Sequence, residues 1–140
     1  MKYSTYEHKV HYYETDQMGV VHHSNYIRWF EEARVDYMEK IGVNYARMEE
    51  LGIISPVTSA TCDYKSMTRF GDTVSIITEL IKFNGIKFTL IYNVYDVKTK
   101  ELRAIGETSH CFINREGKLV SLKKENKDYY DVFLCALKTD

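Results

Sequence analysis

One stretch of this 140-residue sequence constrains the fold more than any other. Between residues 26 and 41, large apolar side chains recur every three or four positions, and charged side chains occupy most positions between them. That spacing places the two kinds of side chain on opposite faces of a helix. We therefore predict an uninterrupted amphipathic helix whose apolar face the rest of the chain must cover. Its apolar members are Tyr26, Trp29, Phe30, Ala33, Tyr37, Met38 and Ile41.

The ends of this helix carry recognisable signals. Ser24 or Asn25 can cap its first turn, because short polar side chains accept hydrogen bonds from the free N–H groups there. Gly42 stands just past its end, where glycine is the usual residue. A second, shorter helix is predicted from Asn44 to Leu51.

On either side of the helices the apolar pattern changes to every second residue, which is typical of strands. The connections between the later strands have hairpin length, so the strands should pair antiparallel. The dipeptide Asn84-Gly85 predicts a type I′ turn, with positive φ at both residues. A closing helix is predicted from Asn126 to Leu137. The predicted strands are Tyr6–Glu14, Ile54–Met67, Thr73–Phe83, Ile86–Val97 and Leu102–Asn114.

One long helix and one antiparallel sheet can cover each other's apolar faces, which predicts an α+β architecture. Pro56 is the single proline, as expected for long, uninterrupted elements. A chain of 16.5 kDa buries about two-thirds of its surface on folding, enough for one core and too little for two. We expect a single domain spanning residues 1–140.

Composition excludes several classes of function. A net charge of −1 supplies no basic field for nucleic acid, and the apolar runs are too short to span a membrane. Residues 1–8 contain no apolar signal segment, so a cytoplasmic location is expected. The three cysteines are widely spaced among apolar neighbours, which favours reduced thiols over disulfides or a CxxC metal site. They are Cys62, Cys111 and Cys135.

The richest group of polar residues lies between the first predicted strand and the long helix. A helix N-terminus offers free N–H groups and a positive dipole end, which can polarise a carbonyl. A carboxylate in the preceding turn can act on the same carbonyl as a general base or a nucleophile. The group comprises Glu14, Thr15, Asp16, Gly19, His22, His23, Asn25 and Tyr26.

Ordinary structural roles explain the same residues. Asp16 can simply cap a turn, and the two adjacent histidines can be surface residues. A metal site made of His11, His22 and His23 is disfavoured, because adjacent residues of an extended chain point to opposite sides. No HxxxH or CxxC spacing supports such a site.

The run VHYYETDQMGVVHHSNY, from Val10 to Tyr26, continues into WFEEAR at residues 29–34. Together with the segment from Tyr64 to Asp72, which contains RFGD at residues 69–72, it resembles the signature of the 4-hydroxybenzoyl-CoA thioesterase family. The resemblance implies a hotdog fold, in which a curved antiparallel sheet of about five strands wraps a long central helix, here followed by a C-terminal helix. It also implies hydrolysis of acyl-CoA thioesters, with no metal and no cofactor.

The resemblance also implies roles for individual residues. Asp16 matches the catalytic aspartate, which attacks the thioester or activates water, and Gly19 matches the glycine of the same turn. His23 occupies the helix-entry position whose backbone N–H faces the thioester carbonyl, and we expect it to contribute to catalysis. Tyr26 would line the acyl pocket. His22 is a further substrate-binding candidate, with plain packing as its alternative.

The phosphates of CoA require cations at the mouth of the pocket. Lys65, Arg69, Lys87 and Arg103 are the candidates, although a solvated sheet face explains each of them equally well. The family's active sites lie between subunits, so a homodimer or homotetramer is expected, with no nucleic-acid or membrane partner.

The leading hypothesis is therefore an acyl-CoA thioesterase that releases a free acid and CoA. One alternative is a hotdog hydratase or dehydratase, whose catalytic residues usually occupy other positions around the helix. Another is a non-catalytic module that binds acyl-CoA or acyl-carrier protein. An Asp16 side chain pointing away from any pocket, or held in a salt bridge, would favour the module.

Overall fold

The computed structural model describes residues 3–138. Its helices and strands follow the predicted order, with two short additions, a 3-10 turn (η1) after the first strand and a one-turn helix (α3) before the last helix. In chain order the elements are β1 (Tyr3–Lys9), η1 (Tyr12–Glu14), α1 (Ser24–Ile41), α2 (Tyr45–Glu50), β2 (Val57–Tyr64), β3 (Thr73–Phe83), β4 (Lys87–Asp96), β5 (Leu102–Cys111), α3 (Leu122–Glu125) and α4 (Lys127–Ala136).

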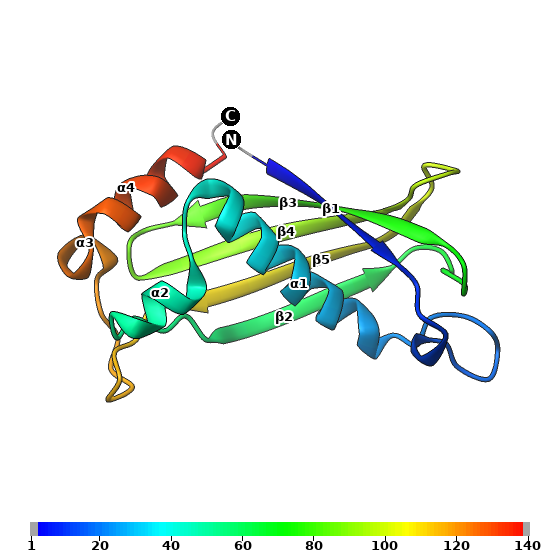
Figure 1. The fold of residues 1–140 in the computed structure, drawn as a ribbon, viewed down its shortest axis with the longest axis horizontal. Helices are drawn as coiled ribbons and strands as arrows, with labels where there is room; N and C mark the ends of the chain where they lie inside the picture. Colours follow the sequence, from blue (N-terminus) through cyan, green and yellow to red (C-terminus); the bar gives the residue numbers. More distant parts are fainter. Residues whose placement is uncertain (1–2, 139–140) are drawn as a thin grey trace.

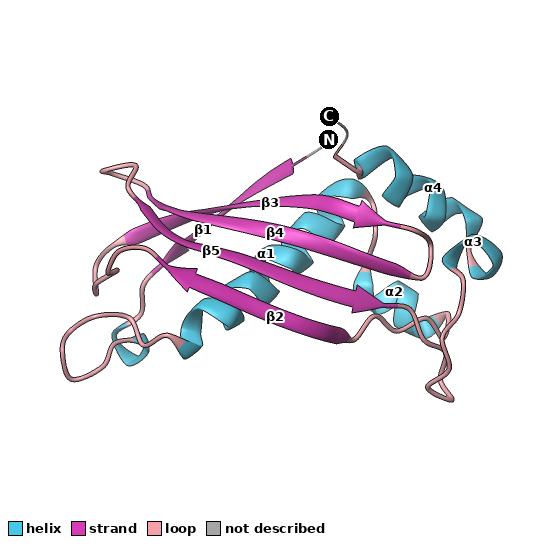
Figure 2. Cartoon of the chain, turned by 180° about the vertical axis from the view of Figure 1, so that it is seen from behind, coloured by secondary structure: helices cyan, strands magenta, loops and turns pink. Residues whose placement is uncertain are grey.

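The five strands form one antiparallel sheet in the order β1-β3-β4-β5-β2. Helix α1 crosses one face of this sheet, with α2 beside its C-terminal end (Figure 1). The view from behind shows the other face of the sheet with no helix over it (Figure 2). The predicted α+β architecture, a curved sheet of about five strands around one long helix, is confirmed.

The centre of the core is a close contact between α1 and the sheet. Phe30 is fully buried, and its ring stacks on that of Tyr92 with the ring centroids 4.6 Å apart. Gly106 is the β5 residue opposite Tyr92, and a Cβ atom built on it would lie 2.1 Å from the Phe30 ring. Glycine is therefore required at this position, because only a bare backbone lets the helix approach the strand so closely.

The first strand is shorter than predicted. Pairing with β3 ends at Lys9, and the next residue, Val10, donates its backbone N–H to the carbonyl of Asp72 instead. The chain then forms η1, which buries Glu14. The apolar alternation that suggested a strand to Glu14 therefore continues past the point where the backbone leaves the sheet.

The predicted N-cap of α1 and the predicted turn type are wrong, whereas Gly42 ends the helix in a left-handed conformation, as expected. The N-cap of α1 is His23, without a side-chain cap, and the amide of Asn25 instead donates to the backbone carbonyl of Glu14. The hairpin at residues 84–86 does form, but Gly85 alone has positive φ there. The Asn84 side chain accepts the N–H groups of the two residues after Gly85, so a side-chain turn replaces the type I′ turn.

The helices of the described chain, residues 3–138, include none that is both long and apolar enough to cross a membrane.

We predict that Gly106→Ala lowers the free energy of unfolding by about 1–3 kcal/mol, because the added methyl group collides with the Phe30 ring. Chemical denaturation measures the loss. The double variant Gly106→Ala/Phe30→Leu tests the cause, because a smaller side chain relieves the collision. Additive losses in the double variant would contradict this account of the contact.

Candidate active site

Asp16 sits in a tight loop between η1 and α1. Its backbone N–H donates to the carbonyl of Val20 (2.8 Å), and the N–H of Gly19 donates back to the carbonyl of Asp16 (3.0 Å). Gly19 has φ +77°, a conformation that glycine adopts without strain, which explains the residue type at this position. The half-buried Asp16 side chain accepts the N–H of Met18 through Oδ1 (2.8 Å). Within residues 3–138 no donor to its second oxygen is found, so this oxygen can meet a ligand.

The Asp16 side chain lines a cavity of about 390 Å³ between the loop, the start of α1 and the end of β2. The wall combines apolar side chains with a few polar groups, as in many ligand sites. Four of the predicted site residues lie here together, namely Asp16, His23, Tyr26 and Lys65. The remaining lining residues are Met18, Val20, Val21, Tyr64, Ser66 and Met67.

The start of α1 contributes a backbone donor to this cavity. Over residues 3–138, no hydrogen-bond acceptor is found for the backbone N–H of His23, the N-cap residue. Tyr64 donates its hydroxyl to the His23 carbonyl (3.2 Å), which ties the end of β2 to the start of the helix. Partial desolvation by the surrounding protein, together with the neighbouring Cys62, raises the pKa of Tyr64 to about 12, so the hydroxyl remains a donor at neutral pH.

Tyr26 and His22 have different surroundings. Tyr26 is buried, donates its hydroxyl to Thr68 (3.0 Å) and packs edge-on against Tyr64 with ring centroids 5.2 Å apart. It is therefore part of the cavity wall. His22 is exposed and is not a lining residue. Its Nδ1 lies 2.8 Å from the hydroxyl of Ser24 and 3.3 Å from that residue's N–H, so it caps the first turn of the helix.

The predicted phosphate-binding cations are dispersed. Lys65 is exposed at the cavity. Arg69 lies on the neighbouring turn, where its backbone pairs with Val20, outside the set of lining residues. Lys87 begins β4 at the opposite end of the sheet, and it lines a separate cavity of about 490 Å³. The side chain of Arg103 contacts three carboxylates and is therefore already neutralised; these are Asp72, Asp96 and Glu101.

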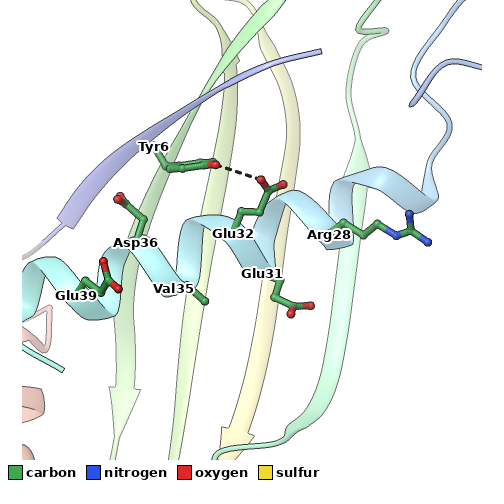
Figure 3. Close-up of a pocket in the computed structure, with 7 residues that line it drawn as sticks. All are labelled: Tyr6, Arg28, Glu31, Glu32, Val35, Asp36 and Glu39. Atoms are coloured by element: carbon green, nitrogen blue, oxygen red, sulfur yellow. Dashed lines mark hydrogen bonds between the residues drawn. The ribbon is translucent and has the colours of Figure 1, made fainter. Parts of the chain in front are cut away.

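A larger hollow, of about 730 Å³, lies along the outer face of α1 (Figure 3). Figure 3 shows four carboxylates along it and one cation, Arg28, with Tyr6 donating a hydrogen bond to Glu32 (3.1 Å). Such a surface repels phosphates, and it does not include the start of the helix. The smaller cavity at Asp16 is therefore the better candidate for an active site.

The sequence identified the loop, the helix entry and Lys65, but it missed the rest of the opposite wall of the cavity. Tyr64, Ser66 and Met67 reach it because β2 ends beside the start of α1, a relation between segments about 40 residues apart. The segment from Tyr64 to Asp72 carried part of the family resemblance, and it was the one available signal. Glu14 was included in the polar group, but its burial was not predicted, because that burial depends on partners from three segments.

Comparisons with known proteins identify the family of this chain. The Thioesterase-like superfamily model matches residues 10–129. A putative esterase from Aquifex aeolicus is 37% identical over 120 residues, covering 86% of this chain and 91% of the relative. A putative acyl-CoA thioesterase, YneP of Bacillus subtilis, is 33% identical and covers 99% of this chain and 100% of the relative.

Solved structures show the same fold. A DHNA-CoA thioesterase from Staphylococcus aureus superposes with a TM-score of 0.92 at 36% identity, covering 96% of this chain and 91% of that one. The 4-hydroxybenzoyl-CoA thioesterase of Pseudomonas sp. strain CBS-3 has a TM-score of 0.83 at 20% identity, covering 94% and 99%, a likeness of fold alone. The extent of the family match, with relatives aligned over nearly their whole length, establishes that the chain belongs to the Thioesterase-like superfamily.

Proposed function

We propose that the protein is an acyl-CoA thioesterase that hydrolyses a thioester to a free acid and CoA. One observation carries this proposal. The Asp16 carboxylate and His23, whose backbone N–H has no acceptor in residues 3–138, line one cavity. The relatives named as thioesterases support the same activity. A cytoplasmic location and a reaction without metal or cofactor, both expected from the sequence, remain parts of the proposal.

The proposed mechanism uses each group according to its chemistry. The N–H of His23, at the positive end of α1, would polarise the thioester carbonyl and stabilise the oxyanion. The Asp16 carboxylate would activate a water molecule or attack the carbonyl carbon itself. If Asp16 activates water, it takes up the water's proton as the hydroxide adds, and collapse of the tetrahedral intermediate breaks the carbon–sulfur bond and releases the acid. If Asp16 attacks directly, the same collapse leaves a mixed anhydride on Asp16, which a water molecule then hydrolyses to the free acid. The thiolate of CoA is a good leaving group, so the site needs no strong general acid.

The surroundings of Asp16 favour catalysis over simple binding. A non-catalytic acyl-CoA or acyl-carrier-protein module would leave the carboxylate outside the pocket or hold it in an ion pair. Asp16 instead lines the cavity, and across residues 3–138 it takes part in no salt bridge. A hydratase or dehydratase would require a histidine paired with an acid. The buried pair of this kind, His8 and Glu14, consists of residues that do not line the cavity.

We predict that Asp16→Asn lowers kcat for acyl-CoA hydrolysis by about 10²–10⁴-fold, the range typical of losing an acid–base group. The amide oxygen can still accept the N–H of Met18, so the loop should remain folded. Release of free thiol from a panel of acyl-CoAs measures the rate. Glu7→Gln, which alters an exposed carboxylate on β1, is the control. Unimpaired turnover by Asp16→Asn would refute the mechanism.

We predict a milder effect for His23→Ala, no more than about tenfold in kcat, because the backbone N–H remains in place while the ring is lost. The same thiol-release assay gives the value. A loss as large as that of Asp16→Asn would show that the imidazole, rather than the backbone, takes part in the reaction.

We also propose that two copies pair through β2, the strand at one edge of the sheet. Seven of its eight residues are exposed, whereas the other edge strand, β1, packs against α1. Tyr6 and Thr5 of β1 contact Glu32 and Lys40 of that helix. A long exposed edge offers unpaired backbone groups to another strand, and a two-fold axis would pair β2 with its own copy.

Antiparallel pairing of the two β2 strands would give Lys87 a role. It places the Val57 end of one protomer beside the Tyr64 end of the other, where the Asp16 cavity lies. In each protomer Val57 pairs with His110, and Lys87 pairs with the adjacent Cys111. Lys87 would therefore lie on the side facing the other protomer's cavity, suited to the phosphates of CoA bound there.

We predict that the protein sediments as a dimer or a dimer of dimers, and that Lys87→Gln raises KM for acyl-CoA by about 3- to 10-fold, as expected for one lost charge-assisted contact. KM for the matching acyl-N-acetylcysteamine, which lacks phosphates, should not change. Lys98→Gln serves as the control at another exposed lysine. A fully active monomer, or equal effects on both substrates, would contradict this arrangement.

A further inference from the structure

Glu14 is a buried carboxylate outside the cavity whose role the proposed mechanism leaves open. It is 4% exposed, and both of its oxygens accept hydrogen bonds. Oε1 lies 2.9 Å from His8 Nε2 and accepts the backbone N–H of His11 at 2.7 Å. Oε2 accepts the indole N–H of Trp29 at 2.6 Å. One side chain thus connects β1, η1 and α1.

The backbone of the same residue holds the loop that carries Asp16. The Glu14 carbonyl accepts the N–H of His22 (2.8 Å) and the side-chain amide of Asn25 (2.8 Å). Both ends of the segment from residue 14 to residue 25 are therefore fastened at Glu14. Asp16 lies two residues after one end, and the N-cap of α1 lies directly after His22.

The hydrogen bonds at Glu14 fit an ionised carboxylate. Burial, the largest single influence, favours the neutral acid, but the donors from His8, His11 and Trp29 together outweigh it and lower the pKa of Glu14. A charge held by three donors fixes its neighbours more firmly than neutral hydrogen bonds would.

The same residues could be considered as a metal site. His8, His11 and Glu14 each offer one ligand atom, and these atoms lie within 4.8 Å of one another. However, both Glu14 oxygens already accept N–H donors, and His8 Nε2, a potential ligand, makes one of these contacts. Hydrogen bonding within the protein therefore satisfies the Glu14 carboxylate, and no ion is needed to explain its burial.

We propose that Glu14 is a positioning residue for the thioesterase reaction: its buried carboxylate sets the distance between the Asp16 carboxylate and the backbone N–H of His23. This inference rests on the proposed function. The two reacting groups belong to a loop and a helix, and Glu14 is bonded to both. Misplacement by about 1 Å in such a pair costs up to about 10²-fold in rate.

The test is Glu14→Gln, which keeps the size of the side chain but replaces one acceptor oxygen by an NH₂ group. Whichever oxygen is replaced, the NH₂ group faces an N–H donor, either that of His11 or that of Trp29, so at least one hydrogen bond of Glu14 is lost. We expect kcat to fall by about 10- to 100-fold with KM changed less than about threefold, because the cavity wall remains while the geometry of the reacting groups is lost. Trp29→Phe removes a single donor and should give a smaller loss in the same direction.

A second measurement does not depend on activity. Amide hydrogen exchange should become faster at residues 14–25 in Glu14→Gln and remain unchanged in β4. The control is Leu80→Ala, which removes a fully buried side chain of the core. It should lower the melting temperature while kcat and exchange at residues 14–25 stay as in the wild type.

The outcomes separate the two proposals. Unchanged exchange at residues 14–25, or loosened exchange with unchanged kcat, would overturn the role of Glu14. A fall in kcat for Leu80→Ala equal to that for Glu14→Gln would also overturn it, because general destabilisation would then suffice. Zn²⁺ binding that orders the loop and is lost in His11→Ala would assign the cluster to an ion instead. A wild-type protein that hydrolyses no acyl-CoA would refute the proposed function, while hydrogen exchange would still decide whether Glu14 orders the loop.

Discussion

The packing of α1 against the sheet is the interaction on which the rest of the structure depends. Four side chains of this helix are completely buried, namely Trp29, Phe30, Ala33 and Tyr37. Removal from water of each of the three large ones stabilises the fold by roughly 1.5–3 kcal/mol. The Phe30 ring fits over Gly106, so helix and strand can meet in one register only. This register determines where α1 begins relative to the ends of the strands. The position of the candidate site follows from it.

The opposite roles that we propose for two carboxylates separated by one residue follow from their different environments. Glu14 faces inward and is surrounded by N–H donors, which hold it ionised and immobile. Asp16 lies on the loop that Glu14 fastens, half-buried at the cavity, with one N–H donor from Met18. A buried charge satisfied by the protein stabilises geometry, whereas a partly exposed one can react with a ligand. The proposed chemistry needs both.

Charge is distributed unevenly around this nearly neutral chain. The outer face of α1 concentrates carboxylates, and Arg103 is balanced by its own acidic neighbours. The cations left for a phosphate-bearing ligand are therefore few and local, with Lys65 at the cavity itself. The exposed β2 edge adds a second source if copies of the chain pair there, because each copy would bring Lys87 towards the other's cavity.

The sequence by itself determined the elements and the reactive segment. Apolar periodicity predicted α1, the strands and the closing helix, and the run around Asp16 and His23 pointed to a thioesterase, because both signals are local in the chain. Only the tertiary structure decided which distant residues join the site. It brought Tyr64 to the start of α1, buried Glu14 and placed Lys87 at the far end of the sheet. Strand order and the packing of α1 control these relations, and both arise from contacts between segments far apart in sequence.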